Sequence, residues 1–435
     1  MKFATKVVAL CAVALFSLSA SLVAQDMNPS NLTNSPYSRY GMGKLGSVGN
    51  TSTRAMGDIG IALRTSSFTN LANPASLTAI DTLTMLFDTG LTAEWASFSE
   101  NGARSIDWNA GFAYMSFHFP LWRNFAMSVS LTPYTMVGYG YGGEEKIEIE
   151  GGVTSKDSLK YSNSYAGDGG LSKMMMGLGW RPINTRTSML SLGVNAAYIF
   201  GTVQHAGSIS ISTGQGQSTI TTREFTARGL ELGTGLQYQQ KLSATRSLIF
   251  GATYSPSTPI KVDAQNLKYT GGDTLSFDSK MSLRAPMKMG VGVAYQIDRK
   301  LIASGEFSFE NWSKVAGLDA NLQKKDDIYK NISKFAVGLE YQPEIYSQNY
   351  LKTVRYRLGA NYKTSYIDVY GSENREYTVS AGFGFPLRNR RSILNLSAEY
   401  THLQPSNSQM LSEDYLRFTF GITFNELMFF RNKLR

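Results

Sequence analysis

Residues 415–424, YLRFTFGITF, carry the pattern that decides the fold. Every second side chain is apolar, and the side chains between them are mostly polar or small. In a pleated strand, this alternation places the apolar side chains on one face and the others on the opposite face. A helix would mix the two sets, because its period is 3.6 residues. The stretch therefore predicts a two-faced β-strand.

The same alternation recurs along most of the chain at nearly even spacing. We predict about fourteen strands, at residues 82–96, 107–119, 123–137, 171–181, 188–202, 222–239, 247–258, 284–297, 300–311, 333–343, 353–366, 375–386, 392–403 and 415–425. In the fifth of these, for example, Leu190, Leu192 and Val194 alternate with Ser191 and Gly193. Strands of this kind are typical of an all-β, transmembrane antiparallel β-barrel, whose outer face meets lipid.

The connections between the predicted strands alternate in length. Short links follow the even strands, as at 182–187 and 387–391, and long links follow the odd strands, as at 138–170 and 260–282. Transmembrane barrels have short periplasmic turns and long external loops. Both chain ends are therefore expected in the periplasm.

Aromatic residues give a further signal of a membrane. They end the outward face of the even strands, at Phe119, Trp180, Tyr238, Tyr295, Tyr341, Phe385 and Phe424. Aromatic rings, above all those of Tyr and Trp, favour the membrane interface. A soluble β-sandwich, the main alternative, accounts for the alternation but not for the link lengths or this belt.

The first 24 residues have the layout of a cleaved signal peptide. Lys2 and Lys6 precede an apolar run, and small residues lead to Ala24, with cleavage after Ala20 as an alternative. We therefore expect a protein of the cell outer membrane in a Gram-negative bacterium. The only cysteine, Cys11, lies in this segment, so the exported chain is expected to have no thiol. No later apolar run reaches the roughly 18 residues that a transmembrane helix needs.

Charge and polar motifs do not indicate catalysis. The net charge is +9, but the basic residues are scattered, so nucleic acid is not expected as a partner. His118, His205 and His402 lie on different predicted strands or their loops, without a metal-ligand spacing. Ser116 and His118 share a strand face but lack a third residue to orient the base. We predict no enzyme, no cofactor and no metal.

Residues 25–81 do not alternate and contain many Gly, Asn, Pro and Ser residues, so they are expected to form a compact irregular segment. Two motifs in it resemble the N-terminal hatch of the FadL-type outer-membrane transporters, whose signature is Asn-Pro-Ala shortly before the first strand. The matching residues are Arg54, Gly57, Asn73, Pro74 and Ala75. The opening 34–43 is similar to versions of the family from Bacteroidota.

The resemblance implies a monomer in which 25–81 is a hatch in the lumen, 82–425 is the barrel and 426–435 is a basic C-terminal extension. It also implies passive uptake of hydrophobic small molecules, such as long-chain fatty acids, through a barrel surrounded by outer-membrane lipid. In this family, substrate leaves through a gap in the wall where the third strand kinks.

Three residues mark the corresponding place in this chain. Pro133 lies in the third predicted strand and is followed by Gly138 and Gly140. Proline lacks a donor for the ladder, and glycine permits a bend. The alternative is that the strand ends at Pro133 and a loop begins.

Charged residues leave the function open. Arg355 and Arg357 are expected to point inward opposite Glu340, either to hold a ligand carboxylate or, as we favour, to pair with carboxylates of the wall or hatch. The predicted loops 138–170 and 260–282 are polar and charged, so the substrate class rests on the resemblance. A second hypothesis is a barrel of the same superfamily that binds protein in a secretion or assembly complex. A diffusion porin would require an open lumen.

Overall fold

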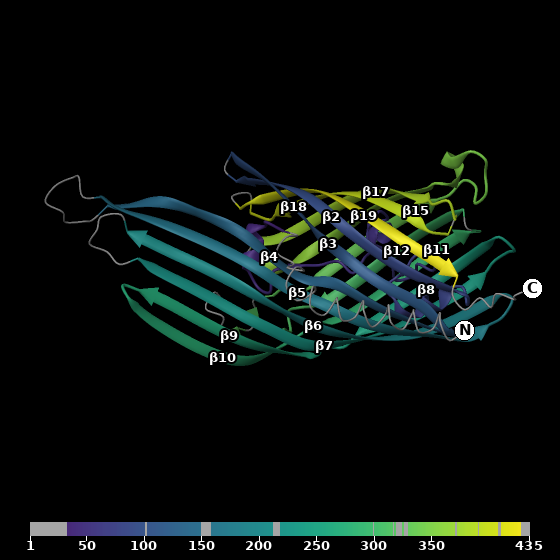
Figure 1. The fold of residues 1–435 in the computed structure, drawn as a ribbon, viewed down its shortest axis with the longest axis horizontal. Coiled ribbons are helices and arrows are strands. Elements are labelled where there is room, and N and C mark those ends of the chain that lie inside the picture. Colours follow the sequence, from purple (N-terminus) through teal and green to yellow (C-terminus); the bar gives the residue numbers. More distant parts are fainter. Residues whose placement is uncertain are drawn as a thin grey trace, which may run out of the picture.

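The computed structural model describes residues 33–100, 102–148, 158–211, 218–298, 300–315, 317–318, 324–325, 329–369, 372–389, 391–407 and 410–427. The predicted signal peptide and most of the predicted C-terminal extension lie outside the described residues. Within them, the chain is an antiparallel sheet that closes on itself (Figure 1).

Fourteen strands form the ring, as the alternation predicts. In ring order they are β2 (Thr84–Glu100), β3 (Ala103–Trp122), β4 (Phe125–Glu148), β5 (Ser158–Asn184), β6 (Ser188–Ile211), β7 (Thr219–Lys241), β8 (Arg246–Ser255), β11 (Met287–Ile297), β12 (Leu301–Asn311), β15 (Ile332–Tyr341), β16 (Arg355–Val369), β17 (Ser372–Pro386), β18 (Ile393–Pro405) and β19 (Ser412–Leu427). The ring closes because β19 pairs with β2 from Ser412↔Ser99 to Leu427↔Thr84.

The wall is apolar outside and polar inside. On β19, Phe418 and Phe420 are 44% and 49% exposed, whereas the intervening Thr419 is 1% exposed. Of the seven aromatics expected near one interface, Trp180, Tyr238, Tyr341 and Phe424 are exposed on the outer face. A barrel whose outer face meets water would carry mostly polar side chains outside and apolar ones inside. The observed pattern is the opposite and fits a barrel in lipid.

The predicted loops 138–170, 203–221 and 260–282 are wrong, because most of these residues extend strands or form a hairpin. β4 and β5 continue through most of 138–170, and β6 and β7 take up most of 203–221. Residues 260–282 lie in a hairpin of β9 (Pro259–Thr270) and β10 (Asp273–Arg284), which pairs with the outer half of β7. Figure 1 shows these ribbons projecting from one end of the ring. Pairing between neighbours and a buried apolar face, which includes Val203, Phe225 and Val262, hold these ribbons together.

The N-terminal segment (residues 33–83) has little regular structure. It contains η2 (Pro36–Arg39), β1 (Lys44–Leu45), α2 (Thr51–Arg54) and η3 (Pro74–Ala79). The remaining elements outside the ring are β13 (Gly317–Leu318), β14 (Lys324–Lys325) and η4 (Tyr350–Thr353). In the part of the chain that the structure describes, no helix has the length and apolar character to cross a membrane.

Candidate functional site

The N-terminal segment and the inner face of the wall enclose a cavity of about 340 Å³. Charged side chains of both signs line it, namely Lys44, Arg54, Lys173, Lys288, Lys334, Lys363 and Arg417, and Asp58, Glu231, Glu306, Glu310, Glu376 and Glu399. Pockets for hydrophobic ligands are mostly lined by apolar and aromatic side chains with few polar groups. This cavity differs in its many charged groups, whose signs nearly balance.

The Asn-Pro-Ala tripeptide joins the N-terminal segment to the wall. Asn73 caps η3, since its side-chain oxygen accepts a hydrogen bond from the Ala75 N–H at 3.0 Å. Its amide donates to the Ile61 carbonyl at 2.7 Å and to the Leu236 carbonyl of β7 at 3.2 Å. Pro74 follows at the first helical position, where no N–H is needed. Asn73 and Ala75 are fully buried.

Gly57 lies where the N-terminal segment touches β15 and β16. Its φ of +72° is left-handed, and an added Cβ would lie 2.6 Å from the Val337 carbonyl oxygen and 2.7 Å from that of Ala360. Its N–H donates to the Ser380 hydroxyl of β17 at 2.9 Å. Only glycine combines this conformation with so close an approach.

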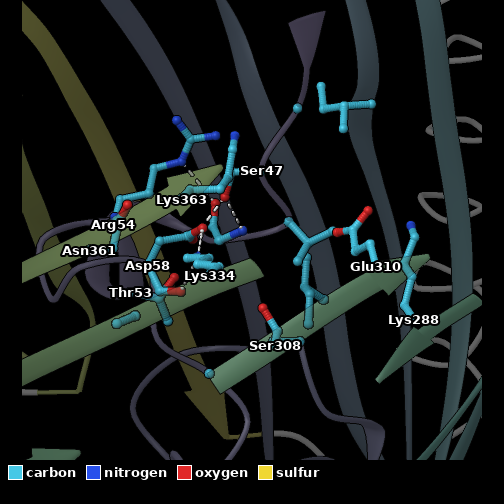
Figure 2. A pocket seen from close by; sticks show the side chains of 18 of the residues that line it. Ser47, Thr53, Arg54, Asp58, Lys288, Ser308, Glu310, Lys334, Asn361 and Lys363 are labelled. Atoms are coloured by element: carbon cyan, nitrogen blue, oxygen red, sulfur yellow. Dashed lines mark hydrogen bonds and ion pairs between the residues drawn. The ribbon is translucent and has the colours of Figure 1, made fainter. Parts of the chain in front are cut away.

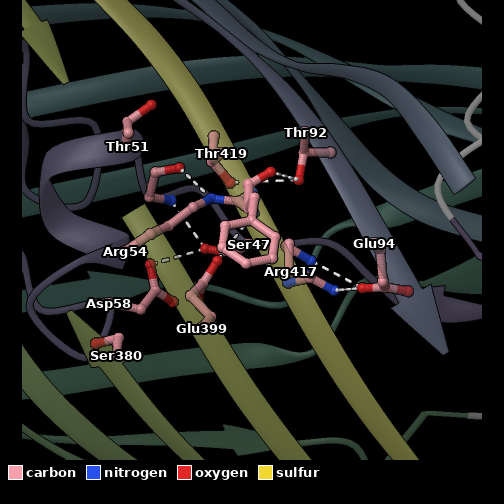
Figure 3. Close-up of polar contacts among 12 residues, drawn as sticks. Ser47, Thr51, Arg54, Asp58, Thr92, Glu94, Ser380, Glu399, Arg417 and Thr419 are labelled. Atoms are coloured by element: carbon pink, nitrogen blue, oxygen red, sulfur yellow. Dashed lines mark hydrogen bonds and ion pairs between the residues drawn. The ribbon is translucent and has the colours of Figure 1, made fainter. Parts of the chain in front are cut away.

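Arg54, the last residue of α2, is buried and points toward β18. Its Nε donates to the Gly49 carbonyl at 3.0 Å, and its Nη1 lies 3.9 Å from Glu399 Oε2. Figure 3 shows this pair beside a second one, in which Arg417 of β19 donates to Glu94 of β2, at 2.8 Å from its Nε. Paired charges cover this side of the cavity.

Asp58 makes the corresponding contact with β15 (Figure 2). Its carboxylate accepts from Lys334 Nζ at 2.7 Å and from the Ser47 hydroxyl at 2.8 Å. Burial raises the pKa of Asp58, but the charge and hydrogen bond of Lys334 outweigh burial, so the net pKa is below its ordinary value. The carboxylate is therefore ionised at neutral pH and holds the segment to the wall.

Two more charged side chains, Glu306 and Arg64, join the N-terminal segment to the wall by hydrogen bonds. Glu306 of β12 accepts from the N–H groups of Gly60 at 2.8 Å and Ala62 at 3.0 Å. Arg64 donates to Ser191 of β6 at 3.2 Å and to Gln237 of β7 at 3.3 Å. Burial lowers the pKa of Arg64 to about 9, and nearby Arg181 adds to the shift.

Lys173, Glu231 and Lys288 form a triad on β5, β7 and β11. Glu231 lies 3.1 Å from Lys288 Nζ and 3.8 Å from Lys173 Nζ. Both ammonium groups also lie over the ring of Tyr134, at 5.3 Å and 5.6 Å from its centroid. The two lysines therefore already have an acidic and an aromatic partner in the wall.

The pairing of neighbouring strands in the wall is incomplete between β3 and β4. Their pairing runs from Trp122↔Phe125 to Met115↔Leu131 and goes no further in the described residues, although both strands continue. Pro133 does not end its strand, and the register with β5 shifts between Pro133 and Thr135.

The free edge of β4 pairs with the N-terminal segment. β1 pairs with it at Leu45↔Thr135, and the N–H of Gly46 donates to the Tyr134 carbonyl at 2.9 Å. Ser38 bonds to Gly138 of the same strand at 3.1 and 3.2 Å. Gly140 lies further along and has open space around it. We call this region the β3–β4 junction (residues 103–115 and 131–148).

Arg355, Arg357 and Glu340 lie together inside the ring. Glu340 accepts from Arg355 Nη1 at 3.2 Å and from Arg357 Nε at 2.6 Å. Arg357 also donates to Asn395 of β18 at 2.8 Å, and Arg355 donates to Ser67 of the N-terminal segment at 2.8 Å. The arginines therefore pair with a wall carboxylate, as we favour from the sequence.

Sequence reasoning missed several residues that join the N-terminal segment to the wall. Glu306, Lys334 and Arg64 received no role, although each lies in a predicted strand or in the predicted hatch. For Glu306 and Lys334, the only signal in the sequence is a charged residue on the polar face of a strand. The sequence does not indicate the partners, which lie 246 and 276 residues away. In the described residues, no group of three His, Cys, Asp or Glu side chains could hold a metal ion.

Comparison with solved structures identifies the fold. The CymD monoaromatic hydrocarbon channel matches with a TM-score of 0.54 at 12% identity, covering 89% of this chain and 98% of that one. The toluene transporter TodX of Pseudomonas putida gives 0.56 at 15%, covering 89% and 99%. A Pseudomonas aeruginosa FadL homologue gives 0.52 at 13%, covering 88% and 99%. At these identities the likeness concerns the fold alone.

The chain thus has the fold of the FadL-type β-barrels, as the strand pattern predicts. Comparison with curated proteins gave no match. The family model named BamG matches residues 5–435, nearly the whole sequence. The protein belongs to the BamG family.

Proposed function

We propose that this protein is a protein-binding component of an assembly complex in the outer membrane of a Gram-negative bacterium. The many bonds between the N-terminal segment and the barrel wall carry the proposal. The N-terminal segment bonds to inward-facing groups around the ring, on β2, β6, β7, β12, β15 and β18. A segment held on so many sides acts as a hatch in this proposal and makes the barrel a rigid platform for other proteins.

Two further features support this proposal. The name of the family hints at a link with an assembly complex. The ribbons formed by β4–β7, β9 and β10 also present a broad ordered surface beyond the ring (Figure 1). Binding of other proteins needs such a surface, whereas passage of a solute does not.

A second candidate is passive uptake of hydrophobic small molecules of the fatty-acid type, with lateral exit at the β3–β4 junction. The incomplete pairing beside Pro133 favours it, because the cavity is lined by Pro133 and Tyr134 at this place. Gly138 and Gly140 follow on the same free edge. In this reading, β1 has to leave β4 before a substrate passes.

One experiment separates the two candidates. The full chain is purified in mild detergent with an affinity tag, the proteins that co-purify are quantified, and binding of a labelled long-chain fatty acid is measured by equilibrium dialysis. We expect a stoichiometric protein partner and no saturable fatty-acid binding. Saturable binding without a partner supports uptake and contradicts our proposal.

Conductance tests the hatch itself. In planar bilayers we expect the full chain to conduct poorly and a variant that lacks residues 33–81 to conduct as an open pore. Equal conductance of the two would contradict the role of the segment as a hatch. High conductance of the full chain would indicate a diffusion porin.

A further inference from the structure

A groove of about 710 Å³ lies at the short-turn end of the ring, away from the projecting ribbons. Its walls are the β15–β16 connection (342–354), the β17–β18 turn and the last residues of β19. Its floor includes Ser66 and Ser67 of the N-terminal segment and Arg355 of the pair described above. Because Ser66, Ser67 and Arg355 lie inside the ring, the groove opens along the barrel axis and not toward lipid.

The β15–β16 connection is unusual among the turns at this end. It spans thirteen residues, 342–354, whereas the β3–β4 turn has two residues and the β5–β6 turn has three. Gln342 donates to the Thr353 carbonyl at 2.9 Å, and Tyr350 donates to the Pro386 carbonyl of β17 at 3.1 Å. Asn349 caps η4 through the N–H of Leu351 at 3.1 Å. These bonds hold the connection in place over the groove.

Large apolar side chains on this connection and on the groove rim are uncovered. Tyr346 is 74% exposed, Leu351 64% and Tyr350 51%, and Leu83 and Leu427 on the facing rim are 48% and 45% exposed. A tyrosine held by ordered backbone loses little entropy on binding and offers both an apolar ring and a hydroxyl. Clustered exposed groups of this kind mark interaction sites.

The charge of this end is strongly one-sided. Among the described residues of the six short-end connections, six are basic and two are acidic: Arg123, Arg186, Lys300, Lys352, Arg388 and Arg391, against Asp298 and Glu344. Lys352 pairs with Glu344 at 3.0 Å. Arg388 and Arg391 line the groove and are exposed, as is one acidic residue of its lining, Asp81. Arg355, the remaining charged residue of the lining, pairs with Glu340, so the groove keeps an excess of positive charge. An occupant of the groove is therefore favoured if it is negatively charged.

We propose that this groove is the docking site for an acidic segment of a periplasmic partner protein. Carboxylates of the segment pair with Arg388 and Arg391, and an apolar side chain packs against Tyr346 and Tyr350. The inference rests on the proposed function, which it deepens by assigning the partner a surface and a charge. Phospholipid headgroups do not fit as well, because the groove faces the barrel axis.

Site-specific crosslinking tests the proposal in cells that express the full chain. A photo-crosslinking amino acid replaces Tyr346, and the crosslinked peptide is identified by mass spectrometry. We expect one periplasmic protein, crosslinked through a segment of net negative charge. The double charge reversal R388E/R391E should reduce the crosslink at least about tenfold, whereas the matched reversal R123E/R186E, outside the groove, should leave it unchanged.

Several outcomes overturn the groove assignment. They are crosslinks to lipid alone, crosslinks to a neutral or basic segment, and equal yields with both reversals. Heat-modifiability on gels checks that every variant still forms the barrel. Binding of the wild-type and R388E/R391E chains to phosphatidylglycerol vesicles is also compared, and a tenfold loss there without a protein crosslink assigns the surface to lipid. If a partner co-purifies equally with wild type and R388E/R391E, the groove assignment fails and the proposed function stands. If none co-purifies with either, both fail.

Discussion

Two parts of the barrel wall have the same alternating sequence but differ in their pairing. From β11 to β16, neighbouring strands pair along most of their length, as in Lys334↔Lys363 to Tyr341↔Tyr356. At the β3–β4 junction, pairing stops at Met115↔Leu131. The N-terminal segment meets the paired wall through side chains and through close glycines such as Gly57, Gly338 and Gly359, whereas at the junction it pairs with β4 as a strand does. The same segment is thus a packed body on one side and part of the wall on the other.

The largest effect is expected where the paired wall contains buried charge. Arg357→Ala leaves the Glu340 carboxylate buried with only Arg355 to neutralise it, and we expect a loss of about 3–5 kcal/mol in the free energy of unfolding. Urea unfolding in lipid vesicles measures it. Arg186→Ala, an exposed turn arginine, is the control and should change stability by less than about 0.5 kcal/mol. A loss below about 1 kcal/mol for Arg357→Ala would show that the pair is not important for stability.

Gly57→Ala should break the close contact with the paired wall. The added Cβ meets two carbonyl oxygens and the backbone is left-handed, so we expect a loss of about 2–3 kcal/mol. Faster proteolysis of the N-terminal segment should accompany it. Gly140→Ala at the junction has open space and should cost no more than about 0.5 kcal/mol. Equal effects of the two substitutions would contradict the contrast between the two regions.

Gly46→Pro should release β1 from the junction. Proline removes the N–H that bonds to Tyr134, and a Cβ at this position lies 2.4 Å from the Pro133 carbonyl oxygen. The reporter is a cysteine introduced by Thr135→Cys. Thr135 is fully buried, and the new cysteine is expected to be the sole thiol of the exported chain. We expect labelling by a water-soluble maleimide to speed up about tenfold. Ser304→Cys on the paired wall should label at the same rate with and without Gly46→Pro.

The smallest effect is expected at Asp58, and it should depend on pH. Because its pKa is lowered by Lys334 and its hydrogen bonds despite burial, the pair stabilises the protein at pH above about 3.9, the ordinary value for aspartate. That stability is lost as the pH falls through the lowered pKa. Asp58→Asn should therefore cost about 1 kcal/mol at pH 7, and this cost should shrink as the pH falls through the lowered pKa of Asp58. A cost that persists in acid would exclude the ion pair as its source.

The fold could be predicted from the sequence to a large extent. Period-two alternation and the aromatic belt, as at Phe418 and Trp180, indicated a closed barrel of fourteen strands. The same reasoning failed at the projecting end of the ring, where β9 and β10 form a hairpin in place of the predicted loop. The period-two signal is present there, because Ile260, Val262 and Ala264 are buried on one face of β9. The many polar and charged residues of 260–282 led to the prediction of a loop instead.

The site was predictable only in part. Asn73, Pro74, Ala75 and Gly57 were found by motif, and Arg357 was expected to pair with a carboxylate. Glu306 and Lys334 were missed, because their partners in the N-terminal segment are far away in sequence. The Bacteroidota-like character of residues 34–43 stays a prediction.

The sequence by itself determined which face of each strand points outward, since each second side chain is apolar there. Only the tertiary structure decided how the interior is filled and where the ring is left incompletely paired. Hydrogen bonds and ion pairs between distant segments depend on the closed ring bringing their atoms within about 3 Å. Local patterns in the sequence do not encode those distances.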